Sequence, residues 1–325
     1  MRTLALFLAA VATVCAAVDG VVLNQTTKQP QPRALVTLYS LGQGGMQPVQ
    51  TLQTGDDGRF SIDHSVQTPH LLQTIHDGVI YNQMLQPGAP ATGLTLPVYD
   101  ASNKPENTTV AQHMVLIEPM AETWHISESV IFRNAGAVTY NDPANGTLRV
   151  WLPPAMEGAP RVRVTAPQGI PLDRAAEAAG EKNVYKIDFP VKPGETRFDI
   201  SYVVPAPETR TLAGRVLHGG GPVRLVAPAG VTLSGEGITQ IGEEPRTHAK
   251  VYDVAGDAYA VTIEGAGSLE TEAQPAGAPA AGGGSGVQRV RAPIYDRMRV
   301  ILGLAFAVLL AGFLLLYRRG GERQG

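Results

Sequence analysis

The chain contains 325 residues, with 26 Lys and Arg against 29 Asp and Glu, so its formal charge is −3. This near-zero balance argues against nucleic acid as a partner, because binding phosphates needs a concentrated basic surface. A single cysteine excludes a disulfide framework and thiol-rich metal sites, whereas 36 glycines and 25 prolines favour short strands joined by tight turns.

Residues 1–17 have the layout of a secretory signal peptide. Arg2 is followed by an apolar run that is too short to cross a membrane, and then by small residues that end at Ala17. We expect cleavage after Ala17, which would remove the only cysteine of the chain. In the alternative reading of a lipoprotein, Cys15 would be the acylated residue, but the preceding Val14 is larger than the residue that such sites carry.

Residues 18–88 form the first predicted piece of the exported body. Over residues 34–39, which read ALVTLY, apolar side chains occupy both alternating sets of positions. This pattern predicts a strand that is buried on both faces. Further along, Asp57-Gly58 predicts a tight hairpin turn in which the glycine supplies a positive φ.

One set of residues in this piece follows a known pattern of strand starts, inward positions and turns: Gly20, Val22, Pro32, Ala34, Val36, Leu38, Thr54, Asp57, Gly58, Arg59, Phe60 and Ile62. With these residues the segment resembles the carboxypeptidase regulatory-like domain, a prealbumin-like β-sandwich found in exported bacterial proteins. In this pattern Phe60 and Ile62 point inward and close the sandwich over Val36 and Leu38. The resemblance implies a fold and no peptidase activity.

Residues 94–207 and 208–271 carry further runs with a period of two, separated by turn signals. The segment VRVTAPQGIPL at 162–172 matches VRLVAPAGVTL at 223–233 in six positions. Two readings stay open: a duplicated domain, or two pieces of one larger sandwich. In either case the sequence predicts an all-β protein of tandem prealbumin-like or Ig-like β-sandwich domains.

The C-terminal part is predicted to tether this body to a membrane. Residues 272–296 are rich in Ala, Gly and Pro, which favours a flexible stalk. Residues 298–317 include eighteen consecutive uncharged residues, roughly 27 Å as a helix, which predicts one transmembrane helix. Residues 318–325 begin with two arginines and are expected to form a cytoplasmic tail. A single helical span favours the inner membrane, so we expect a periplasmic body.

Three aromatic residues are the candidate ligand-stacking side chains, because aromatic faces pack on sugar rings: Trp124, Trp151 and Tyr81. His125 and Glu128 have the spacing of the zinc pair of metallocarboxypeptidases. In a strand, however, residues three apart point to opposite faces, so we expect no metal to be held by this pair.

Three further histidines, His64, His70 and His76, are spaced by six residues. An even spacing would place a pair on one face of a strand. Pro69 and the turn signal that begins at Asp77 are expected to interrupt such a strand, which favours histidines in solvated loops.

The sequence contains no phosphate-binding loop, no G-x-S-x-G motif and no cysteine nucleophile, so it predicts a protein that is not an enzyme and has no cofactor. The leading interpretation is a membrane-anchored, extracytoplasmic β-sandwich protein that acts as an interaction or scaffold module of the bacterial envelope. Two alternatives are a carbohydrate-binding module and an accessory subunit of an envelope transport or assembly complex. The expected partners are therefore the membrane itself and either an envelope protein or a glycan.

Overall fold

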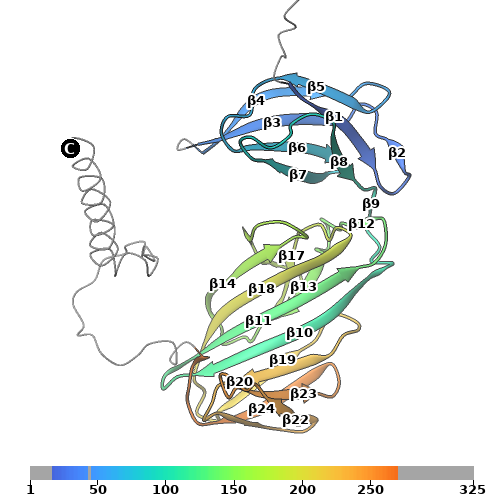
Figure 1. The fold of residues 1–325 in the computed structure, drawn as a ribbon. Helices are drawn as coiled ribbons and strands as arrows, with labels where there is room; N and C mark the ends of the chain where they lie inside the picture. The colour runs from blue at the N-terminus through green and yellow to red at the C-terminus, as the bar shows by residue number, and fades with distance from the viewer. Residues whose placement is uncertain (1–16, 43–44, 270–325) are drawn as a thin grey trace, which may run out of the picture. The chain divides into compact units, whose positions relative to one another are not determined.

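The computed structural model describes residues 17–42 and 45–269 (Figure 1). These residues form strands joined by turns and loops and contain no α-helix, which confirms the predicted all-β class. The described part includes no helix of the length and apolarity needed to cross a membrane. The predicted stalk at 272–296, the predicted span at 298–317 and nearly all of the predicted signal peptide lie outside the described residues.

The first sandwich consists of two sheets. In one, the strand order is β2-β1-β5, and β1 also pairs with β8. The bounds are β1 (Ala17–Asn24), β2 (Gln29–Pro30), β5 (Arg59–Asp63) and β8 (Leu94–Val98). In the other, the order is β4-β3-β6-β7. Here the bounds are β3 (Leu35–Gly42), β4 (Gly45–Gln53), β6 (His70–His76) and β7 (Val79–Leu85).

One buried apolar cluster lies between these two sheets. Phe60 and Ile62 belong to it together with Val36 and Leu38, as the alternation of these side chains predicts. The cluster also contains Val18 and Val22 of β1, Leu72 of β6, Val79, Tyr81 and Leu85 of β7, and Leu96 and Val98 of β8. Asp57-Gly58 does form a tight turn, in which Gly58 has a φ of 71° and its N–H donates to the carbonyl of Gly55. The predicted hairpin is wrong, however, because β4 before the turn pairs with β3, whereas β5 after the turn pairs with β1 in the other sheet.

The parallel pairing of β1 with β8 explains the glycine at position 20. Gly20 lies opposite Leu94 in this register, and a Cβ added to Gly20 would overlap the carbonyl oxygen of Leu94. It would also lie 2.9 Å from Cβ of Leu94. The first sheet therefore extends along the chain to Val98, and it needs a residue without a side chain where its first and last strands meet.

The rest of the described chain is organised around an eight-stranded sheet of order β15-β14-β18-β11-β10-β20-β23-β22 (Figure 1). The bounds of its strands are β10 (Thr108–Pro119), β11 (Thr123–Asn134), β14 (Glu157–Thr165), β15 (Leu172–Arg174), β18 (Gly194–Pro205), β20 (Val223–Ala227), β22 (Ile238–Glu243) and β23 (Lys250–Val254).

Two three-stranded sheets accompany it. One has the order β13-β17-β16, and the other has the order β19-β24-β21. The bounds are β13 (Leu148–Trp151), β16 (Glu177–Ala178), β17 (Val184–Ile187), β19 (Thr211–Arg215), β21 (Thr232–Ser234) and β24 (Ala258–Glu264). A short parallel pair, β9 (Ala101–Ser102) and β12 (Thr139–Tyr140), completes this part of the chain.

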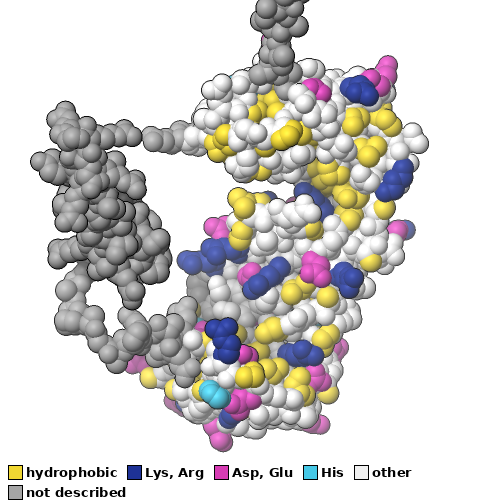
Figure 2. Space-filling model, viewed as in Figure 1, with side chains coloured by type: hydrophobic (Ala, Val, Ile, Leu, Met, Phe, Trp, Pro, Cys, Tyr) yellow, Lys and Arg dark blue, Asp and Glu magenta, His cyan; other side chains and the backbone are white. Residues whose placement is uncertain are grey.

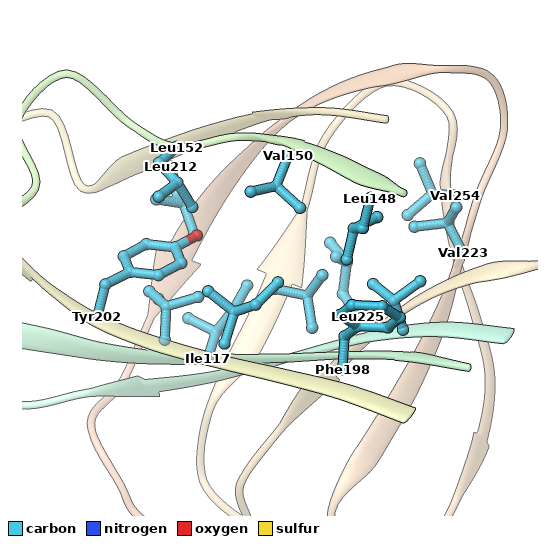
Figure 3. Close-up of a cluster of buried hydrophobic side chains, with 14 of the residues drawn as sticks. Ile117, Leu148, Val150, Leu152, Phe198, Tyr202, Leu212, Val223, Leu225 and Val254 are labelled. Atoms are coloured by element: carbon cyan, nitrogen blue, oxygen red, sulfur yellow. The ribbon is translucent and has the colours of Figure 1, made fainter. Parts of the chain in front are cut away.

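A single buried cluster fills this second sandwich. Figure 3 shows how Ile117, Phe198 and Leu225 from the large sheet face Leu148, Val150 and Leu152 from the β13 side. Because β20 pairs with β10 in one sheet, and because both strands contribute to one core, most of the piece predicted at 94–207 shares a sheet and a core with the piece predicted at 208–271. The predicted boundary at 94 is too early, because β8 (Leu94–Val98) belongs to the first sandwich.

Candidate binding surface

The three candidate stacking rings do not form an exposed platform. Trp124 is completely buried in the core of the second sandwich. Tyr81 is buried in the first sandwich, where its hydroxyl group donates to the carbonyl of Tyr99 (2.9 Å) and burial raises its pKa to about 12. Trp151 is half-buried on β13. A sugar ring needs an open aromatic face, and burial removes that face from Trp124 and Tyr81.

His125 and Glu128 lie on opposite faces of β11, as their spacing in a strand predicts. The side chain of His125 is exposed, whereas Glu128 is buried among the inward-facing residues of the sheet. Glu128 accepts a hydrogen bond from the hydroxyl group of Tyr202 (2.6 Å), and its other oxygen lies 3.0 Å from Nε2 of His113. The structure therefore assigns Glu128 to an internal polar network.

This network continues to the edge of the core. Nδ1 of His113 lies 3.0 Å from Nε2 of His218, a half-buried residue in the loop after β19. Because a carboxylate can only accept, Nε2 of His113 donates to Glu128, and Nδ1 of a neutral His113 then accepts from His218. Burial lowers the pKa of His218 to about 4, with the neighbouring His113 as the second cause, so His218 is neutral at pH 7.

The lowered pKa of His218 predicts that the folded chain loses stability in mild acid. Its pKa is about 4 in the folded chain against 6.5 in the unfolded chain, so the unfolded chain binds the proton more readily. The contribution of His218 to stability is complete above pH 6.5 and is lost as the pH falls toward 4. Denaturant midpoints measured across this range should fall less steeply in His218→Gln than in the natural chain. His125→Gln, an exposed control, should keep the natural slope, and equal slopes for all three proteins would contradict the prediction.

The loop positions predicted for His70 and His76 are wrong. Both residues lie on β6, which begins directly after Pro69 and ends directly before Asp77. These residues bound the strand rather than interrupt it. His70 is buried, and its Nε2 atom lies 2.9 Å from Nε2 of His64.

The outer face of the β4-β3-β6-β7 sheet is the most distinctive surface of the first sandwich. None of these four strands contains Asp, Glu, Lys or Arg. Leu35, Ile75 and Ile80 stand opposite one another on β3, β6 and β7 and form one row. They are 39 %, 41 % and 47 % exposed. This row is therefore an apolar strip on an uncharged sheet.

A second row lies further along the same face, where Tyr39, Leu71 and Met84 pair across the same three strands. Between the two rows, the amide of Gln73 donates to Asn82 (3.0 Å). The polar side chains at the centre of the face thus bind one another. Figure 2 shows hydrophobic side chains on the visible surface of this sandwich. We call this surface, with Leu35, Tyr39, Leu71, Ile75, Ile80 and Met84, the neutral face.

The neutral face corrects the sequence prediction for residues 34–39. The alternation predicts a strand buried on both faces, and Val36 and Leu38 are indeed buried in the core. Leu35 is instead exposed, and Tyr39 is half-buried. The sequence of β3 is therefore typical of a strand that is buried on both faces, although its outer face is exposed to solvent in the single chain.

Comparisons with known proteins leave the chain without a family. No protein-family model and no curated protein matches it. Among solved structures, the M1 zinc metallopeptidase of Deinococcus radiodurans and a point mutant of it match with 12 % identity and TM-scores of 0.27 and 0.28. Each match covers 48 % of this chain and 42 % of the peptidase chain, so the chain spans less than half of the length of these neighbours. Likeness at this level carries no inference about activity.

Proposed function

We propose that the protein is a non-catalytic interaction module, anchored to the inner membrane by residues 298–317, whose first sandwich binds a partner protein through the neutral face. The observation that carries this proposal is the exposure of an apolar strip on a sheet without charged residues. Protein interfaces are depleted of charged residues at their centre, and exposed apolar patches mark binding surfaces. A partner that covers this face would bury the exposed apolar side chains of β3, as the apolar residues on both faces of this strand predict.

The β4 edge of this sheet supports binding by the face rather than by addition of a strand at that edge. β4 is an edge strand and contains Pro48, which has no N–H to offer a further strand. The side chains of Leu35, Ile75 and Ile80 stand out from the sheet and give a partner apolar surface to pack against. We therefore expect the partner to present an apolar surface of its own without a strong net charge.

A photocrosslinking amino acid placed at Ile80 or Met84 of the full chain, expressed in its host, tests this proposal. We expect one discrete crosslinked product from both positions. The same amino acid at Ile241, an exposed apolar residue of the second sandwich, is the matched control and should give no such product. A second change, Ile75→Lys, should abolish the product, because it places an unpaired charge in the centre of the contact.

The Ile75→Lys change leaves the core untouched, so the free energy of unfolding should stay within about 0.5 kcal/mol of the natural value. Crosslinking that is equal at Ile80 and Ile241, or that survives Ile75→Lys, would contradict the proposal. So would the absence of any product from both positions on the neutral face.

A further inference from the structure

Three ligand-type side chains converge at one end of the first sandwich. His76 is the last residue of β6, Asp77 begins the turn to β7, and Asp100 follows β8. One ligand atom from each lies within 4.8 Å of the other two. Nε2 of His76 is 2.8 Å from Oδ1 of Asp100 and 3.7 Å from Oδ2 of Asp77. The side chain of His76 is 13 % exposed, and those of Asp77 and Asp100 are 47 % and 37 % exposed, so the cluster opens to solvent.

The carboxylates of Asp77 and Asp100 share the imidazole of His76 as their ion-pair partner. Within the described residues, the ion pairs of Asp77 and of Asp100 both go to Nε2 of His76. A ring nitrogen makes one good hydrogen bond, and that of His76 goes to Asp100 (2.8 Å). Asp77 is left with the N–H of Ala101 (3.1 Å) as its donor. Two carboxyl groups therefore face one imidazole, and the cluster offers more acceptor oxygens than donors.

The backbone and a buried amide hold the ligand atoms in place. Oδ1 of Asn24 accepts from the N–H groups of Thr26 and Thr27, and its Nδ2 atom donates to Asp100 (2.6 Å). Asn24 is 3 % exposed. Outer groups that orient the ligands in this way are a regular part of metal sites.

We propose that His76, Asp77 and Asp100 form a binding site for a divalent transition metal such as Zn²⁺. Around a tetrahedral Zn²⁺ with bonds of about 2.0–2.1 Å, neighbouring ligand atoms are about 3.3 Å apart. Two of the three present separations, 2.8 Å and 3.7 Å, bracket this value, and all three ligand atoms lie within 4.8 Å of one another, so shifts of at most about 1.5 Å admit the ion. One imidazole and two carboxylates occupy three positions, and the open side leaves the fourth to water. The imidazole favours Zn²⁺ over Ca²⁺ and Mg²⁺, which prefer oxygen ligands only.

Calorimetric titration of the metal-free full chain with Zn²⁺ tests this site. Asp77→Asn is the informative change, because asparagine tolerates the positive φ of 47° at this position and still accepts from Ala101, while the charge is lost. We expect Zn²⁺ to bind about tenfold or more weakly to Asp77→Asn and to His76→Gln. Asp57→Asn, which changes the carboxylate of another Asp-Gly turn, is the matched control and should bind as the natural chain does.

Circular dichroism without metal establishes that each variant is folded before titration. The proposal is overturned if the natural chain binds no Zn²⁺, if Asp77→Asn and His76→Gln bind as tightly as the control, or if Ca²⁺ binds as tightly as Zn²⁺. A loss confined to Asp77→Asn and His76→Gln supports it. This site is independent of the neutral face, and its failure would leave the proposed interaction function unaffected.

Discussion

Replacing Glu128 with alanine is expected to lower the free energy of unfolding of the second sandwich by about 2–6 kcal/mol, because it leaves two buried donors without an acceptor. The change removes the acceptor of the Tyr202 hydroxyl group and the partner of Nε2 of His113, and all three side chains are buried. Burial, with Glu128 as the second cause, holds the pKa of Tyr202 well above its usual value, so the hydroxyl group keeps its proton and needs an acceptor.

The fluorescence of tryptophan during denaturation measures this effect selectively. The chain has two tryptophans, Trp124 and Trp151, and both lie in the second sandwich. Glu128→Gln keeps one acceptor oxygen and should cost less than Glu128→Ala. His125→Ala lies on the opposite, exposed face of the same strand and should stay within about 0.5 kcal/mol of the natural chain. Equal stability of Glu128→Ala and His125→Ala would show that the network does not stabilise the core.

Replacing Gly20 with alanine is expected to cost the first sandwich about 3 kcal/mol, at the upper end of the usual range for overpacking. The added methyl group would overlap the carbonyl oxygen of Leu94 in the adjacent strand, and a strand backbone cannot move aside as a flexible side chain can. The two strands must separate, which weakens the β1·β8 ladder and opens the core at Val22 and Leu96.

Hydrogen–deuterium exchange of the full chain locates this loss. Faster exchange is expected in β1 and β8, while the tryptophan fluorescence transition of the second sandwich should change little. Gly42→Ala provides a matched control, since an added Cβ at Gly42 has no atom within 4 Å. If Gly20→Ala and Gly42→Ala exchange alike, the close approach of β1 and β8 is not the reason for glycine at position 20.

Local patterns in the sequence predict much of the first sandwich. The Asp57-Gly58 turn and the inward direction of Phe60 and Ile62 depend on neighbouring residues, so alternation and turn chemistry are sufficient. The pairing of β1 with β8 joins residues more than 70 positions apart, and no local pattern encodes it. The same non-local pairing carries Asp100 toward His76, which is why the sequence did not indicate this cluster.

The buried network did leave a signal in the sequence. Along β11, the inward positions read Trp124, Ile126, Glu128, Val130 and Phe132, so one carboxylate interrupts an otherwise apolar series. An acidic residue at such a position needs a buried partner. The identity of that partner depends on the order β18-β11-β10 in the sheet, which periodicity cannot provide.

The pairing of β1 with β8 also means that the first sheet can be completed only after β8 has been synthesised. A chain made from its N-terminus presents β1 first and β8 last among the strands of the first sandwich, because β8 ends only at Val98. Until then one edge of β1 has no neighbour, and an open edge can pair with other chains. The interval between the emergence of β1 and of β8 is thus the period in which this sandwich is most exposed to misassembly, and a chaperone that shields β1 would act within it.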